Sequence, residues 1–97
     1  MLDGRTILKL NDDVILKSVN NSFRALNVND GNQYRLNLVS FKMLENADGK
    51  RNIDDIVNEL TKIFDVEKTT LKDDILLFYS EALQKKIIFL VEIDENN

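Results

Sequence analysis

The sequence of 97 residues contains no cysteine, no histidine and no tryptophan. Without cysteine there is neither a disulfide nor a zinc–thiolate site, so the fold must be stabilised by packing alone. Histidine is the usual general base for serine and cysteine nucleophiles, and its absence excludes such catalytic pairs. It also excludes histidine-type metal sites. We therefore expect no cofactor and no enzymatic activity.

Long apolar runs and an excess of positive charge are also missing. The longest apolar run, at residues 87–91, is far shorter than the roughly 20 residues that span a bilayer, and residues 1–5 do not resemble a signal peptide. The net charge of −4 predicts no general attraction to nucleic acid or anionic lipid. These features indicate a cytoplasmic protein whose partners include neither nucleic acids nor membranes.

The residues that are present are typical of a globular domain, with 43% apolar and 31% charged side chains. A chain of this length has room for one hydrophobic core. No proline, low-complexity tract or repeat divides it. We predict a single domain over residues 1–97, with loose polar tails at residues 1–5 and 94–97.

Apolar and polar residues alternate in the first part of the chain, as they do in half-buried strands. The alternating segments are residues 7–10, 14–16, 23–28 and 34–36. Between them lie clusters of asparagine, aspartate, serine and glycine that favour turns. Asn29-Asp30-Gly31 is the clearest hairpin signal. The pattern predicts an antiparallel meander that forms a three-stranded amino-terminal sheet.

From about Asn37 onward the apolar spacing becomes helical and predicts three helices and a short terminal strand. The clearest start signal is Asn52 with Asp55 three positions later, because such a pair can satisfy each other's backbone groups. The predicted elements are a helix from Asn37 or Ser40 to Asp48-Gly49, a helix from Asn52 to about Asp65, a helix from Thr69 or Thr70 to Lys85-Lys86, and a strand at residues 87–91. Together with the meander they define an α+β fold.

The third helix carries more apolar residues than one buried face requires. One stripe, suited to packing on the other helices, consists of Leu71, Ile75, Phe78 and Ala82. A second stripe, about 100° away, consists of Leu76, Tyr79 and Leu83. The meander either covers this second stripe, or the stripe forms one wall of a groove that binds a peptide beside a strand edge.

Residues 32–37 offer such an edge, because they follow the hairpin and lead into the first helix. The outward residues of this segment are polar. Arg35 is either a charge that guards an exposed edge against aggregation or a contact for an added strand.

Four short motifs occur in a fixed order along this part of the chain. They are Gly31, Tyr34, Leu36 and Asn37; then Asp48-Gly49; then Asn52, Asp55 and Ile56; and finally Phe64-Asp65-Val66 before the last helix. In the order and spacing of these motifs, residues 20–88 resemble the PqqD-like family, the precursor-recognition domain of ribosomally made, post-translationally modified peptides (RiPPs). The chain departs from the family at Leu44, where an aromatic residue is frequent, and at Lys86, where a glycine is frequent. Both departures look like structural substitutions, so the resemblance predicts the fold more firmly than the particular pathway.

The resemblance implies a winged-helix-like domain in which a three-stranded antiparallel sheet packs on three helices. It also implies that the leader segment of a precursor peptide adds as a strand in the cleft against the third helix. Members of the family then present the precursor to a modifying enzyme, often a radical SAM enzyme, and perform no chemistry themselves.

Carried over to this sequence, the resemblance implies a set of peptide-binding residues on one strand and one helix. They are Asn32, Gln33, Tyr34, Arg35 and Leu36 on the strand, and Lys72, Leu76, Tyr79 and Leu83 on the helix. The strand would pair with the leader backbone, and the three apolar helix residues would line pockets for alternate leader side chains. Lys72 and Arg35 would meet leader carboxylates.

Three other interpretations remain. A winged-helix DNA-binding regulator would read DNA with the third helix, but Asp73, Asp74 and Glu81 occupy its exposed positions and no arginine lies on it. An enzyme would need paired carboxylates in a cleft, whereas adjacent aspartates on a helix point about 100° apart. A general protein-interaction module, such as an antitoxin-like partner, is the third alternative.

Overall fold

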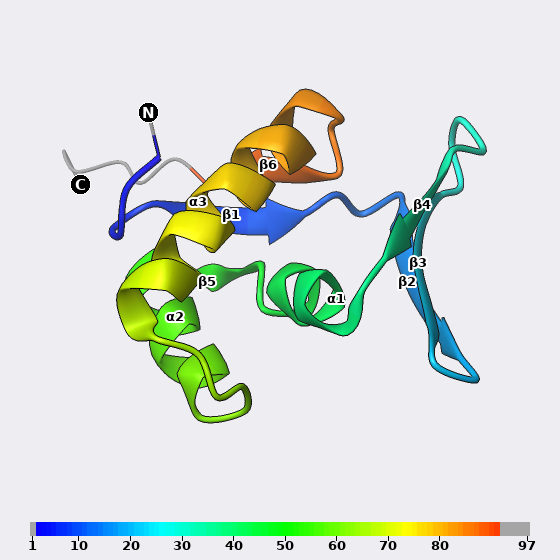
Figure 1. The fold of residues 1–97 in the computed structure, drawn as a ribbon. Helices are drawn as coiled ribbons and strands as arrows, with labels where there is room; N and C mark the ends of the chain where they lie inside the picture. Colours follow the sequence, from blue (N-terminus) through cyan, green and yellow to red (C-terminus); the bar gives the residue numbers. More distant parts are fainter. Residues whose placement is uncertain (1, 92–97) are drawn as a thin grey trace, which may run out of the picture.

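The computed structural model describes residues 2–91, which form two antiparallel three-stranded sheets and three helices (Figure 1). The strands are β1 (Ile7–Leu10), β2 (Val14–Val19), β3 (Ser22–Asn27), β4 (Gln33–Leu36), β5 (Asp48–Asn52) and β6 (Ile88–Leu90). The helices are α1 (Leu38–Glu45), α2 (Ile53–Thr61) and α3 (Lys68–Gln84). The predicted α+β architecture is confirmed, including the short carboxy-terminal strand.

One sheet, which we call the meander sheet, has the order β2-β3-β4 and is built from consecutive strands. Asn20 and Asn21 join β2 to β3 with φ angles of 50° and 64°, a left-handed conformation that asparagine tolerates. Gly31, in the turn before β4, has a φ angle of 78°. The turns predicted at both positions are confirmed.

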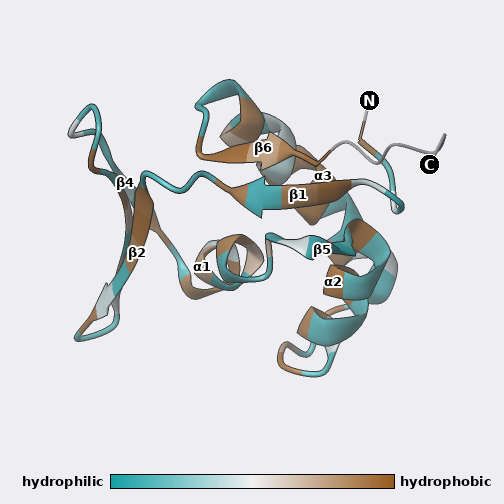
Figure 2. Ribbon diagram, turned by 180° about the vertical axis from the view of Figure 1, so that it is seen from behind, coloured by the Kyte–Doolittle hydropathy of each residue, from teal (hydrophilic) through white to brown (hydrophobic). Residues whose placement is uncertain are grey.

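The other sheet, which we call the central sheet, has the order β5-β1-β6 and joins segments that are far apart in the sequence. Leu8 of β1 pairs with Leu90 of β6, and Ile7 pairs with Asn52 of β5. The prediction that residues 7–10 belong to the meander was therefore wrong. A hydrophilic loop separates β1 from β2 and lets the two strands enter different sheets (Figure 2).

Two of the three helices, α1 and α2, begin where the sequence offers a capping side chain. The side chain of Asn37 accepts a hydrogen bond from the backbone N–H of Ser40 at 2.8 Å, and Asn52 and Asp55 form the expected reciprocal cap. Both predicted starts are confirmed.

The predicted helix ends were less accurate. The first helix ends at Glu45, and Asp48-Gly49 begins β5 instead of stopping the helix. The second helix ends at Thr61, because the chain turns there and Phe64 packs back against the core. The third helix begins at Lys68, just before the predicted Thr69 or Thr70, and has no threonine cap. It ends at Gln84, next to the predicted end at Lys85-Lys86.

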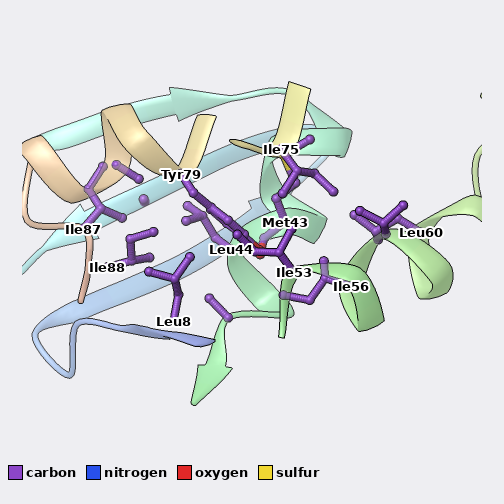
Figure 3. Close-up of a cluster of buried hydrophobic side chains, with 14 of the residues drawn as sticks. Leu8, Met43, Leu44, Ile53, Ile56, Leu60, Ile75, Tyr79, Ile87 and Ile88 are labelled. Atoms are coloured by element: carbon purple, nitrogen blue, oxygen red, sulfur yellow. The ribbon is translucent and has the colours of Figure 1, made fainter. Parts of the chain in front are cut away.

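The core lies between the central sheet and the helices. α3 packs against α2 and β6, and α1 packs against β3 and β4. The rings of Phe23 on β3 and Phe41 on α1 lie 5.0 Å apart, which fixes the inner face of the meander sheet against α1. Figure 3 shows side chains from β1, α1, α2 and α3 gathered in one buried cluster.

Residues 3–5, which we expected to belong to a loose tail, form a turn with Thr6 beside the start of α2. The backbone N–H of Asp3 donates to Oγ1 of Thr6 at 3.0 Å, and the N–H of Asp54 donates to the carbonyl of Gly4 at 2.9 Å. The tail predicted at residues 94–97 lies outside the described residues.

Candidate functional site

β4 is an edge of the meander sheet, because within residues 2–91 it pairs with β3 alone. The backbone N–H of Asn27 donates to the carbonyl of Asn32 at 2.9 Å, which sets the phase of the β3–β4 ladder. Hydrogen-bonded and non-hydrogen-bonded pairs alternate in an antiparallel ladder. The backbone groups of Tyr34 and Leu36 therefore face β3, and those of Gln33 and Arg35 face the open edge.

A cleft of about 430 Å³ lies beside this edge, between β4, the start of α1 and the last turns of α3. Figure 1 shows the two elements that supply most of its lining, β4 and the orange, carboxy-terminal end of α3. Its apolar lining consists of Tyr34, Leu36, Phe78, Ala82 and Ile87, and its polar lining of Gln33, Arg35, Asn37, Ser40, Glu81 and Lys85. A strand added to β4 would direct every second side chain into this cleft.

Two cations and one carboxylate line the cleft. The Nζ atom of Lys85 lies 5.5 Å from the ring centroid of Tyr34, in a cation–π contact that holds the lysine over β4. Arg35 is exposed on β4, and Glu81 lies on α3 one helical turn before Lys85. Lys85 and Glu81 carry opposite charges on the α3 side of the cleft, and Arg35 adds a positive charge at its rim.

The structure brings four of the predicted strand residues together at this cleft. Gln33, Tyr34, Arg35 and Leu36 all line it, with the side chains of Tyr34 and Leu36 half-buried. Asn32 lies just before β4, where its carbonyl accepts the hydrogen bond that closes the β3–β4 turn.

The predicted helix residues lie elsewhere. Tyr79 is fully buried, and its hydroxyl donates a hydrogen bond to the carbonyl of Met43; Figure 3 shows it within the core cluster. Lys72 forms an ion pair with Asp54 of α2 at 3.0 Å. Leu76 and Leu83 are half-buried, pack against the core and do not line the cleft.

Tyr79 and Phe78 have exchanged the places that the sequence pattern assigned to them. The buried stripe of α3 is Leu71, Ile75, Tyr79 and Ala82, while Phe78 faces the cleft. A buried tyrosine needs a partner for its hydroxyl, and the Met43 carbonyl supplies one. Burial raises the pKa of Tyr79 well above its ordinary value, so its hydroxyl remains a donor.

Sequence reasoning missed the helix face that lines the cleft, which consists of Phe78, Glu81, Ala82 and Lys85. The steps of three and four residues between them are helical, so the signal was present in the spacing. Adjacent aromatics at 78 and 79 fit the core equally well by pattern, and only tertiary packing selects one of them.

The part of the chain that the structure describes offers little for metal chemistry or membrane insertion. Residues 2–91 contain no group of three or more acidic side chains that could hold a metal ion. Among the same residues, no helix combines the length and the apolar character needed to cross a membrane.

The comparisons with known proteins bear on this arrangement. Residues 24–88 match the sequence family described as coenzyme PQQ synthesis protein D (PqqD). The chain belongs to the PqqD family. This confirms the resemblance drawn from the motifs between Gly31 and Val66.

Two solved structures share the fold. TbiB1 in complex with the TbiA(beta) leader peptide superposes with a TM-score of 0.71 at 17% identity, over 90% of this chain and 99% of that chain. Lasso peptide synthetase B1 complexed with the leader peptide gives a TM-score of 0.72 at 16% identity, over 84% and 96% of the two chains. No curated protein sequence matches the chain.

Proposed function

We propose that this PqqD-family chain binds the leader segment of a ribosomal precursor peptide and presents it to a modifying enzyme during the biosynthesis of a peptide natural product. Membership of the family supports this proposal. So does the shared fold of two proteins whose structures contain leader peptides.

The observation that carries the proposal is the cleft that lies directly beside the open edge of β4. An extended leader would pair with the outward backbone groups of Gln33 and Arg35 and place alternate side chains against Phe78 and Ala82. Main-chain hydrogen bonds would supply affinity, and the cleft would supply selectivity.

The predicted binding residues divide into two roles under this proposal. Residues 32–36 form the strand along which the leader lies. Lys72, Leu76, Tyr79 and Leu83 hold α3 in place from its other faces, through the ion pair with Asp54 and the core contacts described above. Direct contacts on α3 come from the cleft-lining face instead.

In this role the chain performs no chemistry of its own. The modifying enzyme is a radical SAM enzyme, as the family resemblance implies, or another component of a lasso peptide synthetase, which the name of one of the two similar structures suggests. Titrating each enzyme into a preformed complex of the chain and its leader would separate these two partners.

The proposal is tested by an NMR titration of the ¹⁵N-labelled protein with the leader half of a candidate precursor encoded beside the gene. We expect saturable shifts of the backbone amides of residues 33–36 and 78–85. Saturable binding that instead shifts only residues of β5 and β6 would overturn the proposal.

A matched pair of variants sharpens this test. Phe78→Ala removes an apolar wall of the cleft and should weaken binding about tenfold, whereas Leu77→Ala alters the neighbouring, exposed side chain and should leave affinity unchanged. Equal effects of the two substitutions would mean that the cleft does not hold the peptide.

A further inference from the structure

A row of three cations crosses the outer face of the meander sheet, which is turned away from α1. Lys17 on β2 lies directly opposite Arg24 on β3, and Arg24 lies directly opposite Arg35 on β4. All three side chains are exposed. We call this set the cation row.

The cation row is not neutralised within the described part of the chain. Strands β2, β3 and β4 contain no aspartate or glutamate, and the ion pairs formed among residues 2–91 involve other side chains. Arg24 donates to the amide oxygen of Gln33 at 3.3 Å, which is a neutral partner. Like charges directly opposite each other destabilise a sheet, and this arrangement occurs in a protein of net negative charge.

The geometry of the ladder brings two of these cations especially close. Arg24 and Arg35 form a non-hydrogen-bonded pair, by the same alternation that turns the Arg35 backbone outward, and side chains lie closer in such pairs. Both guanidinium groups are therefore placed where an anionic group from outside the chain would relieve their mutual repulsion.

The cation row is continuous with the cleft. Arg35 and Gln33 line the cleft, and Gln33 also lines a hollow of about 380 Å³ together with Lys17, Val19, Ser22 and Arg24. The row therefore begins at the strand edge where the proposed guest peptide adds.

We infer that the guest peptide carries an aspartate or glutamate opposite Arg35, flanked on both sides by apolar residues that enter the cleft. Successive side chains of an added strand point to opposite faces of the sheet, whichever way the strand runs. A residue opposite Arg35 therefore faces the cation row, while its two neighbours face Phe78 and Ala82. This inference rests on the proposed function and specifies the class of peptide: an amphipathic strand with an acidic outer face.

The three cations should contribute to peptide binding in the order of their distance from the guest strand. Strands are spaced at about 4.8 Å, so a guest carboxylate lies about one strand spacing from Arg35, two from Arg24 and three from Lys17. Screening in 0.1 M salt acts over about 10 Å. The contribution to peptide binding should therefore decrease from Arg35 to Arg24 to Lys17.

The experiment is a selection from a phage-displayed library of random 12-residue peptides, first on the wild-type protein. We expect enrichment of aspartate or glutamate at one position, with apolar residues immediately before and after it. With the best peptide, Arg35→Glu should weaken binding about tenfold, Arg24→Glu about threefold and Lys17→Glu less than twofold. Arg35→Gln, which adds no like charge, serves as a milder second variant at the same position.

The matched control is Lys68→Glu, which makes the same charge change at the first residue of α3. A rise of 1.5 Å per residue places it about 25 Å from the cleft end of that helix, and its affinity should equal that of the wild type. A peptide with lysine in place of its acidic residue should bind Arg35→Glu more tightly than it binds the wild type.

The outcomes separate this inference from the proposed function. If the selected peptides shift the amides of residues 33–36 but show no acidic preference, and Arg35→Glu behaves like Lys68→Glu, the inference fails and the proposed function stands. If the selected peptides leave those amides unshifted, the proposed function fails first. Two results would overturn the inference and assign the cation row to a polyanion lying across the sheet. One is an equal loss of peptide affinity in Arg35→Glu, Arg24→Glu and Lys17→Glu; the other is displacement of the peptide by duplex DNA.

Discussion

The two sheets of this small protein differ in how they are assembled and in what they leave open. The central sheet joins residues from both ends of the chain, and α3 packs against its β6 strand. The meander sheet is local in sequence, packs one face on α1, and leaves both its outer face and the β4 edge uncovered within residues 2–91. Under the proposed function, stability and recognition are divided between the two sheets. α3 contributes to both, because Tyr79 faces the core and Phe78 faces the cleft.

The largest effect should come from removing Tyr79, the largest fully buried side chain. Tyr79→Ala should lower the free energy of unfolding by about 3–5 kcal/mol, because it leaves a cavity and an unpaired Met43 carbonyl. Tyr79→Phe, which keeps the ring, should lower it by about 1–2 kcal/mol. Urea denaturation measures both, and a Tyr79→Ala protein of wild-type stability would contradict the division of roles on α3.

The next largest effect on stability comes from a pair of substitutions, one in each sheet. Leu8→Ala truncates a fully buried side chain on β1 and should lower the free energy of unfolding by about 2–5 kcal/mol. Ile15→Ala acts on the outer face of the meander sheet, where the side chain is 45% exposed, and should change it by about 0.5 kcal/mol or less. Thermal unfolding of both variants tests the comparison; similar losses would mean that the outer face is buried in solution by another chain.

A smaller effect on stability, with a clear effect on binding, is expected from Gln33→Pro. The substitution removes an N–H that faces the open edge, and proline is tolerated at such positions in edge strands. Leader affinity should fall about tenfold or more while the circular dichroism spectrum stays close to that of the wild type. Tyr34→Pro is the contrasting variant, because it removes an N–H directed at β3 and should weaken the fold itself. Unchanged affinity in Gln33→Pro would place the guest strand elsewhere.

The smallest effect concerns Asp48 of β5. Backbone hydrogen bonds from Arg51 and Lys50, together with the Arg51 side chain, lower the pKa of the Asp48 carboxyl from 3.8 to about 2. Because the folded pKa is depressed, this stabilisation is present above about pH 4 and is lost as the pH falls towards 2. The wild type should therefore exceed Asp48→Asn in stability at pH 7, and the difference should shrink between pH 4 and pH 2. A difference that stays constant down to pH 2 would contradict the assignment.

The sequence predicted those features that depend on neighbouring residues. The asparagine turn at 20–21, the Gly31 turn and the caps at Asn37 and Asn52 all rest on chemistry within a few positions, and each was confirmed. The alternating pattern likewise predicted a strand at residues 34–36, and β4 is found at Gln33–Leu36.

The features that were missed depend on contacts between distant residues. The β5 segment Asp48-Gly49-Lys50-Arg51-Asn52 is polar and does not alternate, so it is a strand only because β1 lies beside it. Which face of α3 turns toward the core is set by the carbonyl of Met43, which lies 36 positions before Tyr79 in the sequence. This carbonyl accepts a hydrogen bond from the Tyr79 hydroxyl. No local pattern in the sequence distinguishes Phe78 from Tyr79 at that point.

The most direct test of strand addition at β4 is hydrogen exchange of its backbone amides with and without the leader peptide. In the free protein, the amides of Tyr34 and Leu36 should be protected by β3, while those of Gln33 and Arg35 exchange rapidly. With the leader bound, all four should be protected. Binding that leaves Gln33 and Arg35 in fast exchange, and protects amides of β2 or β6 instead, would contradict the account.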